Sequence, residues 1–270
     1  MQVNDRIVLV GDGIKVGKRG RKMPAVKCLH QESDVNTKPE FIMGHSFQAV
    51  GLLVHAEKSV FSVPLASRIH EGLVFSNRDK RTLLDKMVLL LDSLGVMPAY
   101  YFLVDRYYAC RKIIKPLLQR GQHVISRVKS NAVAYHPAHQ PEDKRKRGRP
   151  KLYGEKVKLR SMLTDKSKLQ VANSPVYGEQ GITIKFTVLD LLWKPVGVIV
   201  RFVAVSHPIH GFAIFMSTDI TLDPLQIIAL YGYRFKIELA FKQAIHTLGA
   251  YFYHFWMMDM KPLKRKNGNQ

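Results

Sequence analysis

AYYFLVD, at residues 99–105, is an apolar run of strand-forming residues that ends on an aspartate, Asp105. RIVLVGD, at residues 6–12, has the same pattern and ends on Asp12. Aromatic and β-branched residues favour strands, and a short apolar run between polar segments is typical of a buried strand. We therefore expect two buried strands, each of which presents a carboxylate where the strand ends.

A third acid, Glu238, lies far downstream in the segment YGYRFKIE at residues 231–238. Asp223 is a good helix cap, Pro224 suits the first helical position and Gly249 can end the helix. The sequence therefore predicts one long helix over this region. Positions i, i+3, i+7 and i+11 of a helix share one face. The residues at those positions are Tyr231, Arg234, Glu238 and Lys242.

The composition indicates a polyanionic partner. The 270 residues include 42 Lys and Arg against 21 Asp and Glu, which gives a net charge of +21 and a pI near 10.0. Residues 106–170 alone carry 18 Lys and Arg against 4 Asp and Glu. Excess basic charge of this size favours nucleic acid as the partner. No apolar stretch approaches the roughly 18 residues of a membrane-spanning helix, so we expect no membrane association and a cytoplasmic, nucleoid-associated protein.

Three acids on separate elements of a basic chain indicate a metal site in an enzyme that cuts or joins nucleic acid. Mg²⁺ prefers carboxylate oxygens, whereas the phosphate backbone is bound by Lys and Arg. An arginine one helical turn from Glu238 could hold a phosphate with its planar fork. The eleven histidines lack the HExxH spacing of a zinc site, and we interpret them as structural.

The first half of the chain has an α/β pattern. Strands are expected at 6–10, 41–56, 100–104 and 123–128, and helices at 83–94 and 107–119, the second interrupted near Pro116. Three strand-like segments then follow one another without a helix, at 182–189, 196–205 and 212–216. They predict a β-rich insertion over residues 132–217 with antiparallel strands. Residues 1–131 and 218–270 would form one discontinuous domain around it.

These blocks resemble the DDE-type insertion-sequence transposases, in the branch whose signature reads Y-x2-R-x3-E-x6-K. Tyr231, Arg234 and Glu238 are in register with that signature. The segment from VGDG around Asp12 resembles the first-aspartate block, and FLVDRYYA around Asp105 resembles the second. The three blocks occur in the family's order and span nearly the whole chain.

The resemblance implies an RNase H-like mixed sheet with flanking helices, interrupted by the β-rich insertion. It implies that Asp12, Asp105 and Glu238 are catalytic and hold two Mg²⁺ ions, for which Mn²⁺ can substitute. The activity would be metal-dependent cleavage at transposon ends, followed by strand transfer through attack of a 3′-hydroxyl on target DNA. The partners would be transposon-end and target DNA, with a homodimer in the synaptic complex.

The chain departs from the family pattern in two respects. The signature places a lysine at position 245, where this chain has Ile245; Lys242 lies one turn earlier. The family carries a helical domain before the first aspartate, whereas this sequence begins almost on the first strand and stops soon after the glutamate helix. We therefore expect a copy truncated at both ends.

Further candidates for DNA contact come from basic and aromatic residues outside the signature. The motif RGRP at 147–150 resembles an AT-hook, which would place Arg in a narrow minor groove; a basic loop on phosphates is the alternative. Trp193 could stack a flipped base or be ordinary packing. The segment after Asp12 could bind phosphate or be a solvated loop. The candidates are Tyr231, Arg234, Lys242, Lys18, Arg19, Arg21, Lys22, Arg147, Arg149 and Trp193.

The sequence thus predicts a DNA transposase, with three alternatives. The chain could be a catalytically inactive DNA-binding remnant, a stand-alone RNase H-like nuclease, or a basic RNA-binding protein in which the three acids are incidental.

Overall fold

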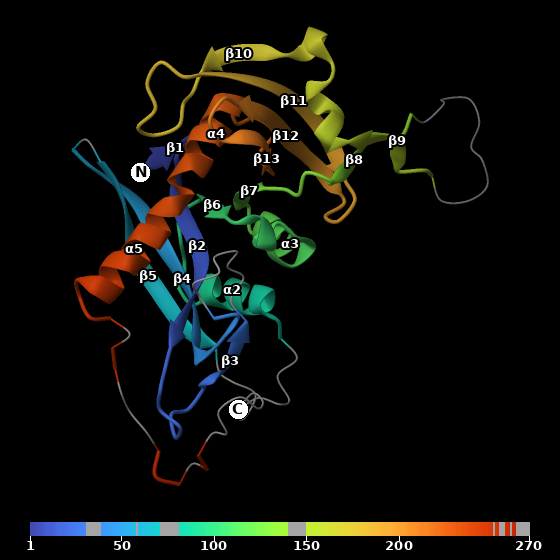
Figure 1. The fold of residues 1–270 in the computed structure, drawn as a ribbon. Coiled ribbons are helices and arrows are strands. Elements are labelled where there is room, and N and C mark those ends of the chain that lie inside the picture. The colour runs from blue at the N-terminus through green and yellow to red at the C-terminus, as the bar shows by residue number, and fades with distance from the viewer. Residues whose placement is uncertain are drawn as a thin grey trace. The chain divides into compact units, whose positions relative to one another are not determined.

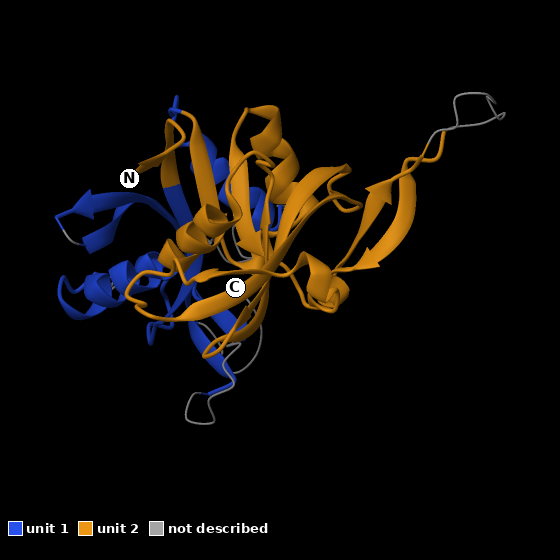
Figure 2. Ribbon diagram, turned by 90° about the horizontal axis from the view of Figure 1, so that it is seen from above, with its two compact units in different colours: residues 1, 9–98, 235–270 blue, residues 2–8, 99–234 orange. Residues whose placement is uncertain are grey.

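The computed structural model describes residues 1–30, 39–57, 59–70, 81–139, 150–250, 252–253, 257–259 and 261–262. The chain divides into two compact units (Figure 2): unit 1 comprises residues 1, 9–98 and 235–270, and unit 2 comprises residues 2–8 and 99–234. Strand β2 (Arg6–Gly17) begins in unit 2 and continues in unit 1. The expected catalytic domain of 1–131 with 218–270, and the insertion over 132–217, stay predictions.

In its described residues, unit 1 is an antiparallel sheet with the helices α2 and α5 (Figure 1). Its longest strand, β4 (Phe41–Ala56), pairs with β2, with β3 (Lys27–His30) and with β5 (Ser59–His70). Helix α2 (Leu83–Asp92) packs on β4 and β5, and helix α5 (Lys236–His246) packs along β5. Thr82 and Asp85 begin α2 with a reciprocal capping box. The helices bury apolar stripes, which include Met87, Leu90 and Leu91 of α2 and Ile237 and Phe241 of α5.

Unit 2 is a mixed sheet whose strands are hydrogen-bonded in the order β2–β6–β7–β13–β12–β11–β8–β9. Strands β6 and β7 pair in parallel, whereas β7, β13, β12, β11, β8 and β9 pair antiparallel along the rest of the sheet. The short strands β1 and β10 add to β2 and β11. The bounds are β1 (Gln2–Val3), β6 (Tyr100–Val104), β7 (His123–Arg127), β8 (Val133–Pro137), β9 (Tyr153–Lys158), β10 (Gln170–Asn173), β11 (Thr183–Trp193), β12 (Val198–His207) and β13 (Gly211–Ser217).

Helices flank the sheet of unit 2. Helix α3 (Arg111–Gln119) packs on β7, and α4 (Pro224–Gly232) packs on β13, β12 and β7 (Figure 1). The short 3₁₀ turns are η1 (Arg106–Tyr108), η2 (Leu159–Leu163), η3 (Lys166–Lys168) and η4 (Tyr233–Phe235). The last residue of η4, Phe235, is the first residue of the C-terminal segment of unit 1. Among the described residues, no helix is long and apolar enough to cross a membrane.

The mixed α/β class predicted from the sequence is confirmed: both units are sheets with flanking helices, in agreement with an RNase H-like fold. The expected strands at 41–56 and 100–104 are β4 and β6. The three consecutive strands predicted between 182 and 216 are β11, β12 and β13, and their antiparallel pairing is confirmed. They continue the sheet that contains β6 and β7, because β13 pairs directly with β7.

The expected interruption of a helix near Pro116 is wrong. Residues Arg106–Tyr108 form a separate 3₁₀ turn, and α3 runs from Arg111 through Pro116 to Gln119. Proline removes one backbone hydrogen bond from a helix interior. Here Ile113, Ile114 and Leu117 on either side of it are fully buried, and their packing holds the helix in one piece.

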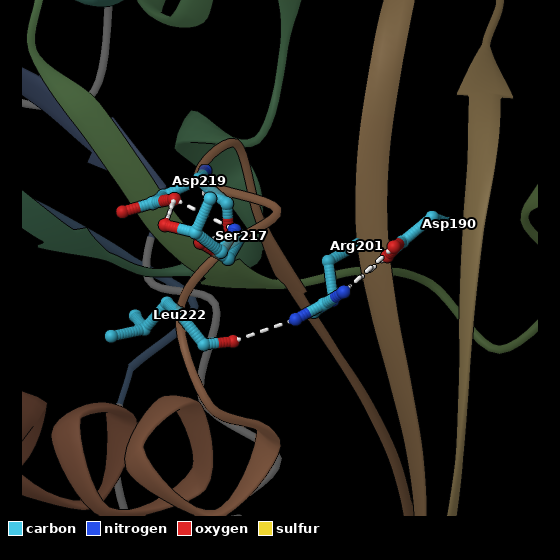
Figure 3. A network of polar contacts seen from close by, with 6 residues as sticks. Asp190, Arg201, Ser217, Asp219 and Leu222 are labelled. Carbon is cyan, nitrogen blue, oxygen red and sulfur yellow. Dashed lines mark hydrogen bonds and ion pairs between the residues drawn. The ribbon is translucent and has the colours of Figure 1, made fainter.

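A buried polar network joins the start of β6 to the end of β13 within unit 2. Tyr101 donates a hydrogen bond to Asp219 Oδ2 (2.6 Å), and Thr221 donates to Asp219 Oδ1 through its backbone N–H (2.9 Å) and its hydroxyl (2.6 Å). Ser217 closes the turn with two bonds to the Asp219 backbone (Figure 3). Because Tyr101 and Asp219 are buried, satisfied hydrogen bonds are required there.

An ion pair drawn in Figure 3 links neighbouring strands, and its arginine also contacts the turn before α4. Arg201 of β12 forms a two-point pair with Asp190 of β11, at 2.8 and 2.7 Å, and donates a third bond to the Leu222 carbonyl (3.0 Å). The two residues are register partners in the β11–β12 ladder. This bond fixes the turn from which α4 begins.

Candidate functional site

Asp105 lies where the sequence predicted, directly after a strand. All five residues of β6 are buried, and Asp105 follows them as the half-buried cap of η1. Its Oδ1 accepts the Arg106 backbone N–H at 2.5 Å. The strand and the 3₁₀ turn together hold this carboxylate in a defined position at the edge of the unit 2 sheet.

Asp12 is not at the end of its strand, and that part of the prediction is wrong. Strand β2 continues to Gly17, and Asp12 pairs with Ala49 in the middle of the ladder. The strand extends because β4 is 16 residues long and supplies partners for every β2 residue from Leu9 onward. Asp12 is half-buried, and its Oδ1 accepts the Gly13 N–H at 2.8 Å.

Glu238 is exposed in the first turn of α5. A carboxylate there interacts favourably with the positive end of the helix dipole. Lys242 is exposed one turn later, and Ile245 occupies the position of the signature lysine. Asp12 and Glu238 belong to unit 1, whereas Asp105 belongs to unit 2. The convergence of the three acids at one metal site therefore stays a prediction.

The single helix face proposed for Tyr231, Arg234, Glu238 and Lys242 is wrong. Tyr231 lies in α4, Arg234 in the 3₁₀ turn η4, and the other two in α5. A 3₁₀ turn advances about 120° per residue against about 100° in an α-helix, so η4 changes the phase of the side chains. The polar segment YGYR, with a glycine at its second position, interrupts the helix.

Tyr231 and Arg234 remain neighbours within unit 2. The Arg234 guanidinium lies 5.9 Å from the centre of the Tyr231 ring, and that ring packs on Phe215 of β13 at 5.0 Å. Burial raises the pKa of Tyr231; the charges of Arg234 and Arg127 oppose the rise, and the charge of Asp105 adds to it. The charges of Asp105, Arg127 and Arg234 thus all act on Tyr231.

Arg127 is a candidate that the sequence reasoning missed. It is the exposed last residue of β7, which runs parallel to β6. The β6–β7 ladder pairs Val104 with Ser126, so Asp105 and Arg127 are the next residues on adjacent strands. HVISR is a short strand-forming segment that ends on an arginine. A predicted strand that ends on a charged residue is the signal that could have identified this cation.

The four basic candidates after Asp12 have different environments. Arg19 and Arg21 are exposed, Lys22 is half-buried, and Lys18 is 6% exposed. Burial lowers the pKa of Lys18. A phosphate can reach the two arginines in this structure, whereas Lys18 would first have to become accessible.

Trp193 has a packing role in this structure, and it also borders a pocket. It is 6% exposed and meets Phe202 edge-to-face at 6.0 Å. A pocket of about 230 Å³ is lined by Trp193 together with Arg106, Ala109, Val128, Lys129, Asn131, Ala132, Val133 and Pro195. Base stacking by Trp193 stays a prediction. Arg147 and Arg149 of the AT-hook-like motif lie outside the described residues.

Within the part of the chain that the structure describes, one His/Glu group has the spacing of a metal site. Glu179, His207 and His210 place ligand atoms within 4.8 Å of one another. His207 Nδ1 accepts the backbone N–H groups of Ile209 and His210, both at 3.1 Å, so its proton is on Nε2. That N–H faces Glu179 Oε2 at 2.9 Å.

This group is hydrogen-bonded as it stands. His210 Nε2 lies 3.0 Å from Glu179 Oε1, and Ser174 donates to Oε2. Burial disfavours the charge on Glu179, but the bonds from Ser174, His207 and His210 outweigh it and lower the pKa of that carboxyl. A histidine that binds a metal through Nε2 usually donates its Nδ1–H to an acceptor. In His207, Nδ1 is itself an acceptor. We interpret the group as a clamp on the β12–β13 turn, consistent with the predicted structural role of the histidines.

The comparisons with known proteins identify a family. A sequence profile of the family described as "Transposase DDE domain" matches residues 70–250. That range contains Asp105, Arg127 and residues 231–238, and Asp12 precedes it. Among solved structures, the cryo-EM structure of the piggyBac transposase synaptic complex with hairpin DNA has a TM-score of 0.47 and 14% identity over 88% of this chain. The chain spans 40% of that transposase. A search of curated proteins finds no significant match.

Proposed function

The chain belongs to the family of transposase DDE domains, and we propose that it cleaves and joins DNA during transposition. The observation that carries this proposal is the family match over residues 70–250, together with the position of Asp105 at the end of a buried strand. The net charge of +21 suits a phosphate backbone as the substrate.

We propose that Asp12, Asp105 and Glu238 hold two Mg²⁺ ions, or Mn²⁺ in their place. Three carboxylates are the hard oxygen donors that these ions take. When bound, the ions would stabilise the charge on the attacking and leaving oxygens. Asp12 lies outside the range matched by the family profile, so it is the member of the triad that most needs a direct test.

The proposed reaction has two steps, a hydrolysis and a transesterification of phosphodiester bonds. In the first, a water oxygen bonds to phosphorus while the bond from phosphorus to the 3′-oxygen breaks, which leaves a 3′-hydroxyl on the transposon end. In the second, that hydroxyl attacks a phosphodiester of target DNA and displaces another 3′-oxygen. Arg234 and Arg127 would hold the phosphate of the cleaved end through charge-assisted hydrogen bonds, and Tyr231 would support Arg234 through its ring.

We also propose that two copies act together on a pair of transposon ends, and that the charge of the chain keeps it on the nucleoid. Exposed basic residues in both units support DNA contact, among them Arg19 and Arg21 in unit 1 and Lys156 and Lys158 in unit 2. Light scattering of the chain with and without DNA carrying the element's ends tests the assembly. A mass of one copy per DNA at saturating protein would contradict it.

The test of the activity is nicking of supercoiled plasmid by the purified chain with Mg²⁺, with Mn²⁺, and with EDTA. We expect metal-dependent nicking that Asp105→Asn and Asp12→Asn both remove. Asp92→Asn is the matched control, because Asp92 is an exposed acid at the end of α2. Loss with Asp105→Asn but not with Asp12→Asn would remove Asp12 from the triad.

Ile245 in place of the signature lysine favours one alternative, a DNA-binding chain without catalytic activity. That alternative predicts salt-sensitive DNA binding with no nicking under any metal. Nicking without joining of a pre-cleaved 3′ end to target DNA would instead indicate a nuclease.

A further inference from the structure

The segment that follows α5 returns to the basic segment between β2 and β3, within unit 1. We call its described residues Phe252, Tyr253 and Met257–Asp259 the C-terminal strap. The Met257 backbone N–H donates to the Lys22 carbonyl at 2.9 Å. The Lys22 ammonium donates to the Met258 carbonyl at 3.0 Å. The backbone of the strap therefore bonds to both the carbonyl and the side chain of Lys22.

Tyr253 covers Lys18. The Lys18 ammonium lies 3.7 Å from the centre of the Tyr253 ring and donates to the Tyr253 carbonyl at 3.1 Å. A cation at this distance over an aromatic face is attracted by the ring, and more strongly where water is excluded. Lys18 is only 6% exposed. The contact therefore satisfies the charge of Lys18 within the protein.

Neighbouring side chains of unit 1 hold the Tyr253 ring in place. His45 is fully buried, and its Nε2 faces the Pro24 carbonyl at 2.8 Å, so the proton is on Nε2. His45 Nδ1 therefore accepts the Tyr253 hydroxyl at 2.6 Å. The two rings stack at 5.8 Å, and Phe47 meets Tyr253 edge-on. Tyr253 also packs against the buried apolar cluster of Met23 and Val26.

His45 stays neutral at physiological pH. Burial lowers its pKa, the hydrogen bond with the Pro24 carbonyl opposes this, and the nearby charges of Lys18 and Lys27 lower it further. The acceptor for the Tyr253 hydroxyl is thus present across the neutral range. Release of the strap therefore depends on ligands that compete for Lys18 and Lys22.

We propose that the C-terminal strap is an autoinhibitory contact that competes with the DNA backbone for Lys18 and Lys22. The Lys18 ammonium is covered by the Tyr253 ring and bonded to its carbonyl, so a phosphate cannot cover it at the same time. The bond to the Met258 carbonyl occupies one donor of the Lys22 ammonium. Arg19 and Arg21 between them are exposed, so DNA first meets the two arginines and gains the lysines only when the strap leaves. This inference rests on the proposed action on DNA.

The first experiment measures the strap without DNA. The full chain is treated with an amine-acylating reagent, and modification of Lys18 is followed by mass spectrometry. We expect a several-fold increase for Tyr253→Ala and a smaller one for Tyr253→Phe, which keeps the ring and loses the bond to His45. Phe252→Ala is the matched control, because Phe252 is 63% exposed in the same strap. Unchanged Lys18 reactivity in Tyr253→Ala overturns the proposal.

The second experiment measures DNA affinity of the same proteins against salt, on duplex DNA of random sequence. Each released lysine adds about 0.9 to the slope of log K against log salt, so Tyr253→Ala should give a steeper slope and tighter binding at low salt than Phe252→Ala. Reactive Lys18 with equal slopes overturns the inference and leaves the proposed function standing. Absence of DNA binding by every variant overturns both.

Discussion

Glu238 tests the proposed chemistry most directly at the scale of one residue. Glu238→Gln keeps the size of the side chain and removes the charge that would hold the metal ions. We expect plasmid nicking to fall by about 10²-fold or more, the scale of loss when a single electrostatic group is removed from an active site. DNA binding should stay equal or become slightly tighter, because one negative charge is lost.

The free energy of unfolding serves as the control for the Glu238→Gln variant. A carboxylate in the first turn of a helix contributes about 0.3–1 kcal/mol through the dipole, so Glu238→Gln should lower the free energy of unfolding by no more than this. Nicking at the wild-type rate by a folded Glu238→Gln protein would show that Glu238 is not a metal ligand.

Arg127 is the residue for which the structure adds a role. Arg127→Gln should slow processing of a pre-cleaved DNA end by about 10- to 100-fold, because a charge-assisted phosphate contact of about 1.5–3 kcal/mol is lost. Arg160→Gln provides the comparison: Arg160 is an exposed arginine of the same unit, on η2. Equal rates for the two variants would exclude a special role for Arg127.

At the scale of one element, the cap of α4 positions Tyr231. Asp223 Oδ1 accepts the N–H groups of Leu225 at 2.9 Å and Gln226 at 3.1 Å. Asp223→Ala should lower the free energy of unfolding by about 1 kcal/mol, measured by urea denaturation. Asp223→Asn retains an acceptor oxygen and should recover most of the loss. Equal stability of the alanine and wild-type proteins would contradict the capping role.

The turn between β13 and α4 should respond to acid. Burial disfavours the charge on Asp219, but hydrogen bonds from Thr221 and Tyr101 outweigh it and lower the pKa of Asp219 in the folded protein. A lowered folded pKa gives stability that is present above the unfolded value, about 3.9, and is lost as the pH falls through the folded value. The wild-type chain should therefore lose stability below about pH 4.

Asp219→Asn separates this contribution from those of other acids. The variant should be less stable than wild type at pH 7, since a charged acceptor is replaced by a neutral one. The difference in unfolding free energy between the two proteins should shrink below about pH 4. A difference that stays constant from pH 7 to pH 3 would show that Asp219 does not contribute through its charge.

At the scale of the whole molecule, the net charge of +21 should dominate association with DNA. Log K should fall linearly with log salt, by about 0.9 for each phosphate contact on duplex DNA. Fluorescence anisotropy with labelled duplex at several salt concentrations measures the slope. Affinity that stays flat between low and moderate salt would rule out an electrostatic mode of binding.

The sequence by itself determined the elements whose signal is local. Apolar runs and their caps identified β4, β6, α2 and the start of α4, and the order of three blocks identified the family. The signal is local because strand preference, capping and helix periodicity depend on neighbours along the chain. Asp105 was placed correctly for the same reason: a buried run of five residues ends immediately before it.

Other features are set by partners outside the local segment, which control the backbone or a side chain. Only the tertiary structure decided these features. Strand β2 continues past Asp12 because β4 pairs with it, and the helix break at η4 separates Tyr231 from Glu238. Arg127 and Asp105 are the next residues on adjacent strands because β6 and β7 pair in parallel register. The sequence predicted phosphate contact for Lys18, or a solvated loop as the alternative, yet Tyr253, 235 positions away, covers it. Such contacts join residues far apart in the chain, and no local pattern records them.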